Sequence, residues 1–328
     1  MHISSKLTMF SATIFALLAF AGNSVLCRLA LLPAELPSAG NDQVLLATGS
    51  QAIDATSFTV LRLLSGSIAL FVFVTINNAR LKRNLTAPNV NFSSLFTIRS
   101  WLASFCLFVY AATFSFAYIS LPTGAGALLL FGCVQLTMIV SSIMAKESLN
   151  TQKYMGVCLA FLGLCLLMYF QGNTNSTKEA TGLALDTSLI TGFILMVVSG
   201  IAWAIYTLLG RASKDPIIDT YANFTKSLLF CGLLCFLYLM LPATVTSYGI
   251  TLALLSGIVS SALGYAVWYY VLPQLSRILA GVIQLLVPVI AAFGGAIWAQ
   301  EAITLPLIIA QIMVLGGIAL VIINKRKS

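Results

Sequence analysis

The chain has 328 residues, of which 59% are hydrophobic and only 8% are charged, and its mean hydropathy is +1.00. Soluble domains contain about 45–50% apolar and about 25% charged residues, so this composition excludes a soluble enzyme, a disordered chain and a collagen-like fibre. The formal net charge of +8 comes from short basic clusters between apolar runs. No basic face is therefore expected, and nucleic acid is not a predicted partner.

Ten apolar segments of helix length follow one another, each near the roughly 20 residues that a bilayer-spanning helix needs. In the first half they cover about residues 8–31, 56–76, 100–119, 123–145 and 154–170. In the second half they cover about residues 188–210, 221–242, 249–271, 278–299 and 303–323. Continuous apolar runs also argue against an outer-membrane barrel, whose strands alternate apolar and polar residues. We predict an all-α polytopic protein with ten transmembrane helices.

The distribution of basic residues predicts the orientation in the membrane, because cytoplasmic loops are enriched in Lys and Arg. With a cytoplasmic N-terminus, thirteen of the seventeen Lys and Arg residues lie on the inside and one, Lys178, lies outside. The other three, Arg28, Arg62 and Lys226, fall within apolar segments. We expect an inner-membrane protein with both termini in the cytoplasm and an uncleaved first helix.

The two halves of the sequence share a pattern. Ala145-Lys146-Glu147 is followed by Gly163 sixteen residues after the glutamate, and Ala299-Gln300-Glu301 is followed by Gly317 at the same interval. Arg62 and Lys226 hold similar places in the second and seventh segments, and Arg28 and Arg211 end the first and sixth. Five helices are an odd number, so the second copy must insert upside down, as in many secondary transporters. The predicted division is a first repeat at 8–170, an external linker at 171–187, a second repeat at 188–323 and a basic cytoplasmic tail at 324–328.

The sequence resembles the drug/metabolite transporter superfamily, specifically its EamA-type members with ten helices in a 5+5 arrangement. The resemblance covers about residues 8–323 and rests on the order of these motifs: Phe20-Ala-Gly-Asn-Ser-Val-Leu-Cys-Arg28, Thr59-Val-Leu-Arg62, Ala117-Tyr118…Pro122…Gly126-Ala127, Glu147…Gly156…Gly163, Ser199-Gly-Ile-Ala-Trp203-Ala-Ile-Tyr206, Gly264-Tyr265, Ala280…Pro288…Glu301 and Gly316-Gly317. It implies export or exchange of small metabolites, often amino acids, without ATP. The acidic loop at 33–57 looks longer than the usual first loop of the family.

The embedded cations are the first candidates for a substrate site, since charge in the bilayer core is costly. No Asp or Glu lies well inside a segment, so we expect these cations to lack intramembrane carboxylate partners. Arg62 and Lys226 are predicted to present positive charge to the carboxylate of an anionic or zwitterionic substrate. The alternative is that both side chains snorkel to the lipid headgroups. Four charges are predicted as gate or helix-end residues: Arg28, Arg211, Glu147 and Glu301.

Aromatic and amide side chains extend the list of cavity candidates. Trp203 and Tyr206 share one helix face, as do Tyr265 and Trp268, and either pair can line a cavity or pack between helices. The amides within the segments need polar partners, from a wet cavity or from a neighbouring helix; they are Asn23, Gln135 and Gln284.

We predict a secondary transporter of small organic metabolites, an exporter or exchanger, that works by alternating access. The single histidine, His2, and seven cysteines scattered in apolar segments predict no metal site, no catalytic residues and no cofactor, and no nucleotide-binding motif occurs. Two alternatives stay open: a membrane-embedded enzyme acting on an amphipathic or lipid-linked substrate, and a non-transporting receptor or scaffold. The predicted partners are a small-molecule substrate and the lipid bilayer, with the protein a monomer or a homodimer.

Overall fold

The computed structural model describes residues 2–32, 52–83, 97–144, 151–175, 187–210, 213, 215–238, 243–271, 274–275 and 283–323. In these ranges the chain folds into helices and contains no sheet; one isolated bridge joins Ile53 and Val245. The helices are α1 (His2–Leu31), α2 (Ala55–Arg83), α3 (Ile98–Ala117), α4 (Thr123–Met144), α5 (Thr151–Asn175), α6 (Thr187–Gly210), α7 (Pro216–Leu237), α8 (Ser247–Leu255), η2 (Ser256–Leu263), α9 (Gly264–Val271), α11 (Leu286–Trp298) and α12 (Leu305–Ile323).

Seven stretches in the described ranges are long and apolar enough to cross a membrane: six lie in single helices, α1–α4, α6 and α7, and one runs from α8 through η2 into α9. Three shorter apolar helices cover Tyr154–Phe170, Leu286–Trp298 and Leu305–Val321. Large apolar side chains face outward on many of these helices; Phe236 is 70% exposed and Phe71 is 50% exposed. Such an apolar exterior suits lipid and not water. The chain is a multi-pass membrane protein.

Capping residues explain where α2 and α7 begin. Asp215 caps α7 by accepting a hydrogen bond from the Ile218 amide, and Pro216 occupies the first turn, where its missing N–H costs nothing. Asp54 caps α2 in the same way through the amide of Ser57. Each aspartate stands immediately before the helix that it caps.

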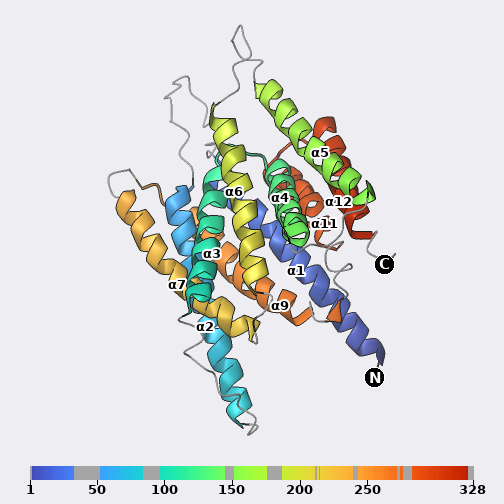
Figure 1. Cartoon of the computed structure of the whole chain (residues 1–328). Helices are drawn as coiled ribbons and strands as arrows, with labels where there is room; N and C mark the ends of the chain where they lie inside the picture. The colour runs from blue at the N-terminus through green and yellow to red at the C-terminus, as the bar shows by residue number, and fades with distance from the viewer. Residues whose placement is uncertain are drawn as a thin grey trace.

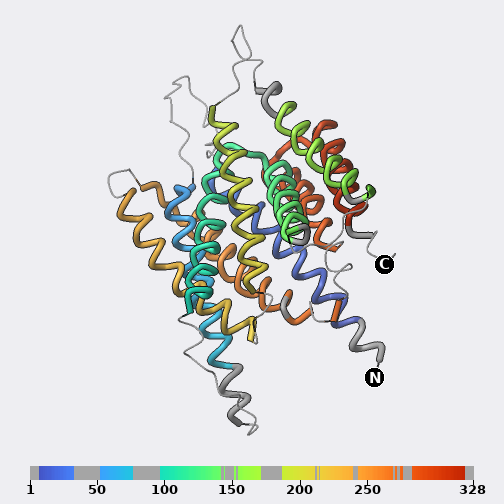
Figure 2. The backbone as a smooth tube through the Cα atoms, in the orientation of Figure 1, coloured from blue at the N-terminus to red at the C-terminus, as the bar shows by residue number. Residues whose placement is uncertain are grey.

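Helices of the two halves pack against each other throughout the bundle. Figure 1 shows α5 and α12 together at one edge and α2 and α7 together at another, with α3, α4 and α6 between them. The tube in Figure 2 lets the chain be followed through the same packing. Small residues allow the closest approach: a Cβ added to Gly163 on α5 would lie 2.9 Å from Val314 Cγ2 on α12.

The segment predicted at 249–271 is helical but is not one regular helix. It divides into α8, the π-helix η2 and α9, a break that apolar periodicity did not predict. In the segment predicted at 278–299, α11 begins at Leu286. Residues 33–51 of the long first loop, residues 176–186 of the linker predicted at 171–187, and the tail at 324–328 lie outside the described residues.

Candidate functional site

Arg62 lies at the centre of the bundle and is only 1% exposed, so its side chain does not snorkel to the membrane surface. Its Nε donates to Ser261 Oγ on η2 at 3.2 Å, and its Nη2 donates to the Tyr110 hydroxyl on α3 at 3.0 Å. The guanidinium carbon also lies 5.2 Å from the ring centroid of Tyr110 and 5.1 Å from that of Phe114. Among the residues that the structure describes, these contacts hold the cation in place without a carboxylate.

A second hydrogen-bonded pair completes the polar group around Arg62. Asn23 on α1 donates through Nδ2 to the Tyr110 hydroxyl at 3.3 Å, and its Oδ1 accepts from Ser256 Oγ at 2.6 Å. We call Asn23, Arg62, Tyr110, Ser256 and Ser261 the Arg62 cluster. Its members come from α1, α2 and α3 in the first half of the chain and from η2 in the second.

The charge of the Arg62 cluster is unbalanced. The hydrogen-bond partners of Arg62 in the described ranges are neutral hydroxyls, and its Nη1 atom has no partner among them. An unsatisfied buried donor costs about 1–3 kcal/mol, and more when it is charged. The buried, unpaired Nη1 of the guanidinium therefore still needs an acceptor. A carboxylate would suit it chemically, because guanidinium binds carboxylate through two parallel hydrogen bonds.

Aromatic rings border the Arg62 cluster on the side of the second half. The Trp203 ring centroid lies 4.7 Å from that of Tyr110, 5.4 Å from that of Tyr206 and 5.0 Å from that of Tyr265. Phe20 on α1 contacts both Tyr265 and Trp268, each at 5.9 Å. The predicted aromatic candidates therefore form one continuous group with Tyr110, in which an apolar substrate body would find contact area.

Lys226 does not join this group. Its ammonium bonds Ser100 Oγ near the start of α3 and lies 5.5 Å from the Trp101 ring centroid. Ser100 and Tyr110 are ten residues apart on one helix, which corresponds to about 15 Å along its axis. The two predicted substrate cations therefore occupy different levels of the bundle, with Lys226 half-buried toward the start of α3.

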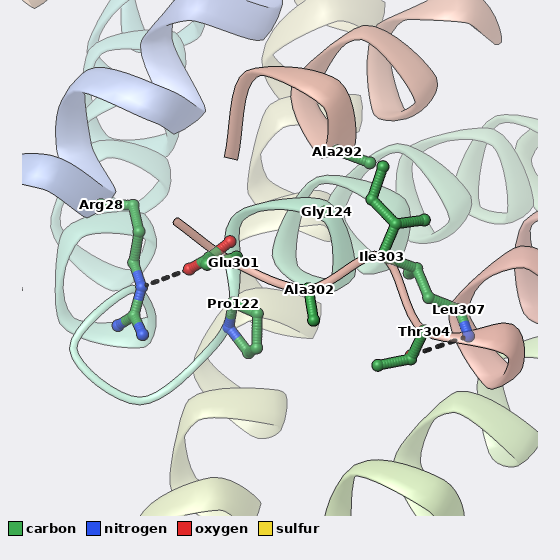
Figure 3. A pocket seen from close by; sticks show the side chains of 9 residues that line it. All are labelled: Arg28, Pro122, Gly124, Ala292, Glu301, Ala302, Ile303, Thr304 and Leu307. Atoms are coloured by element: carbon green, nitrogen blue, oxygen red, sulfur yellow. Dashed lines mark hydrogen bonds and ion pairs between the residues drawn. The ribbon is translucent and has the colours of Figure 1, made fainter. Parts of the chain in front are cut away.

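Arg28 has the carboxylate partner that the sequence did not predict. Its Nε lies 2.9 Å from Glu301 Oε1 (Figure 3). Its Nη1 donates to the carbonyl oxygens of Tyr118 at 2.8 Å and Ile119 at 3.0 Å. The expectation that the embedded cations lack intramembrane carboxylate partners did not foresee that a glutamate at a helix end pairs with Arg28. Glu301 lies 273 positions away in the link between α11 and α12, so only the packing of the two halves brings it to α1.

Glu301 also caps the first turn of α4. Its Oε2 accepts from the Thr123 amide at 2.7 Å, where a negative charge complements the helix dipole. The residue can sit there because Gly295 leaves room: a Cβ at Gly295 would lie 2.7 Å from Glu301 Oε2. The Arg28–Glu301 ion pair thus joins α1, the start of α4 and the α11–α12 link.

A pocket of about 230 Å³ opens beside this ion pair. Figure 3 shows both charged side chains at its edge, together with the other lining residues Pro122, Gly124, Ala292, Ala302, Ile303, Thr304 and Leu307. The side chains of Arg28 and Glu301 are 13% and 17% exposed, so the pair is largely shielded but can be reached from this pocket.

The remaining predicted residues are distributed as follows. Gln135 is half-buried on α4 and Gln284 is half-buried just before α11, and neither belongs to the Arg62 cluster. Arg211 and Glu147 lie outside the described residues.

Sequence reasoning missed Tyr110, Ser256 and Ser261. Tyr110 carries a detectable signal, a hydroxyl-bearing ring in the middle of an otherwise apolar segment. The two serines are five residues apart, a spacing that α-helical periodicity does not place on one face.

Comparison with known proteins decides the family. Residues 190–323 match the model of the EamA-like transporter family. The chain is 40% identical over 310 residues to an uncharacterized protein of Pseudomonas aeruginosa. The aligned region covers 94% of this chain and 93% of that protein. The chain belongs to the EamA-like transporter family. It is therefore a transporter and a member of the drug/metabolite transporter superfamily.

More distant relatives agree with this membership. An uncharacterized transporter of Bacillus subtilis, YoaV, is 23% identical over 283 residues, or 85% of this chain and 91% of the relative. An uncharacterized transporter of Archaeoglobus fulgidus is 29% identical over 233 residues, which are 69% of this chain and 76% of the relative. A crystal structure that is 18% identical shares the fold over 97% of this chain and 99% of that one, with a TM-score of 0.58.

Proposed function

We propose that this EamA-family protein is a secondary transporter that exports or exchanges small anionic or zwitterionic metabolites, such as amino acids, by alternating access without ATP. The architecture in this proposal is ten transmembrane helices in two inverted five-helix repeats, residues 8–170 and 188–323, joined by the external linker 171–187. The protein lies in the inner membrane, and both termini, including the basic tail 324–328, face the cytoplasm.

The packing supports the inverted repeat. If α1–α5 correspond in order to α6, α7, the α8–η2–α9 segment, α11 and α12, exchanging the two sets should map contacts onto contacts. The contacts of α3 with α6 and α7 correspond to those of the α8–η2–α9 segment with α1 and α2. The contact of α4 with α6 corresponds to that of α11 with α1, while α2–α7, α4–α11 and α5–α12 map onto themselves. Two equivalent halves permit two conformations, each open to one side.

The observation that carries the substrate class is the unbalanced charge of Arg62. A cation that is 1% exposed, held only by neutral groups and with Nη1 unpaired in the described part of the chain, is the partner that a carboxylate requires. Its surroundings come from both halves, where transporters of this architecture place their substrate. The neighbouring Trp203 and Tyr265 rings would contact the apolar part of the substrate.

The Arg28–Glu301 ion pair is a contact that would close one side of the transporter during alternating access. It ties α1 of the first repeat to the α11–α12 link of the second, so any rocking of the repeats that separates these elements must break it. We assign it the role of a latch on the external side, the side predicted from the distribution of Lys and Arg.

Flux measurements in proteoliposomes test the proposal. A panel of labelled amino acids, offered with inward and with outward gradients and with unlabelled substrate inside, separates export from exchange. Arg62→Gln should lower carboxylate flux by at least about tenfold, since hydrogen bonds to charged groups contribute about 1.5–3 kcal/mol. Arg99→Gln is the matched control, because Arg99 is exposed and, within the described ranges, donates to the Leu209 carbonyl. Absence of flux over the whole panel would favour an enzyme or a receptor.

A further inference from the structure

The π-helix η2 has an unusual effect on the Arg62 cluster. Ser256 and Ser261 are five residues apart, yet Ser256 bonds Asn23 and Ser261 bonds Arg62 within one polar cluster. In a π-helix each backbone N–H bonds the carbonyl five residues earlier, so residues five apart lie slightly more than one turn from each other on the same side of the helix. In an α-helix they would be separated by about 140° around the axis.

The neighbouring residue Ser260 shows how an α-helical register would change the contacts of this segment. Ser260 is four residues after Ser256, and in an α-helix it would share the face of Ser256 within about 40°. In the structure Ser260 is 3% exposed, and its Oγ instead lies 3.7 Å from where a Cβ on Gly22 of α1 would stand. The register of this segment therefore decides which of two neighbouring serines meets Arg62.

Close packing against α2 holds the π-helix η2 at the level of the Arg62 guanidinium. Gly257 presses against α2 so tightly that a Cβ would collide with the Arg62 carbonyl oxygen and with Ser65 Oγ. Gly257 thereby brings the turn that carries Ser261 to the level of the guanidinium.

We propose that η2 is the positioning element of the substrate site: its π register sets Ser261 on Arg62 Nε and leaves the Nη1 and Nη2 edge of the guanidinium free to bind a substrate carboxylate end-on. A guanidinium has five N–H donors, one on Nε and two on each terminal nitrogen. Ser261 takes the Nε donor and Tyr110 takes one donor of Nη2. Two donors on Nη1 and one on Nη2 remain, and one donor from each nitrogen would form the parallel pair that a carboxylate binds.

This assignment rests on the proposed function and makes Ser261 a positioning residue that does not itself touch the substrate. The probes are the labelled amino acid of highest flux and its carboxamide. Ser261→Ala should raise the KM of the amino acid about tenfold, the effect of one hydrogen bond to a charged group. It should also reduce the preference for carboxylate over carboxamide, while kcat stays within about twofold because the moving elements are untouched.

Ser260→Ala is the matched control, since it removes the same atom one position away and should leave KM and the preference unchanged. Equal effects of the two variants, or an effect of Ser260→Ala alone, would overturn the positioning role. A loss of carboxylate preference confined to Ser261→Ala is a readout that a general loss of stability would not produce.

A second measurement tests the register without any substrate. In the π register, cysteines introduced as Gly22→Cys and Ser260→Cys face each other across α1 and η2, so a mild oxidant should cross-link them. The pair Gly22→Cys and Ser261→Cys should not cross-link. The reverse pattern would overturn the inference even in a protein that transports normally. Absence of flux in the unmodified protein together with the expected cross-link would instead overturn the proposed function and retain the register.

Discussion

Removal of the Glu301 carboxylate should open the side of the protein that we propose to be external. In Glu301→Gln the amide oxygen can still accept from the Thr123 amide, so the change falls mainly on the 2.9 Å contact with Arg28. Breaking a fully buried ion pair costs about 3–5 kcal/mol, and exposed pairs are worth at most about 1 kcal/mol. With side chains 13% and 17% exposed, an intermediate value of about 2 kcal/mol applies.

This energy sets the size of the expected effect. Because about 1.4 kcal/mol corresponds to a tenfold change in an equilibrium, the open population should rise about thirtyfold. The native Cys27 precedes Arg28 on α1 and is 0% exposed, so a membrane-impermeant maleimide should reach it only when the external side opens. Its labelling rate in Glu301→Gln should therefore rise by at least about tenfold.

The assay uses a background in which the exposed cysteines Cys158, Cys165 and Cys235 are serine, with buried Cys231 as an internal reference for unfolding. Arg99→Gln, which removes an arginine–carbonyl bond at an exposed position, should leave Cys27 labelling unchanged. If Cys27 in Glu301→Gln reacts as slowly as in the unmodified protein, the ion pair is not a latch. Equal acceleration at Cys231 would point to general loosening and refute the same reasoning.

Two further predictions follow from packing and from the separation of the cations. Gly317→Ala should lower the free energy of unfolding by about 1–3 kcal/mol, because its Cβ would lie 2.7 Å from the Ala160 amide nitrogen. Gly316→Ala is the control: its Cβ would meet nothing within 4 Å, so this variant should be neutral or stabilising. Thermal unfolding in detergent compares them, and equal shifts would contradict the assigned α5–α12 contact. Lys226→Gln should raise the KM for carboxylate substrates less than Arg62→Gln does, since Lys226 bonds Ser100 at another level of α3; flux assays giving equal KM values would place both cations on one substrate.

Much of the fold was predictable because it depends on local properties of the chain. Each predicted apolar segment coincides with described helix over at least part of its length, since the bilayer imposes a minimum of apolar residues on any helix that crosses it. That Arg62 needs contacts inside the protein or at the lipid headgroups was also foreseeable, because a charge within an apolar segment is costly. Its partner Tyr110 was not, since nothing in the sequence specifies which helix faces α2.

What the sequence determined by itself was the membrane class, the extent of the apolar segments, the family and the embedded cations. The tertiary structure decided their partners. It paired Arg28 with Glu301 across 273 positions, placed Lys226 apart from Arg62, and set Ser261 on Arg62 through a π-helical turn held by the contact of Gly257 with α2. The physical reason is the length of chain over which each property is set. Hydrophobicity and charge act residue by residue, whereas the register of one helix against another depends on the summed packing of both.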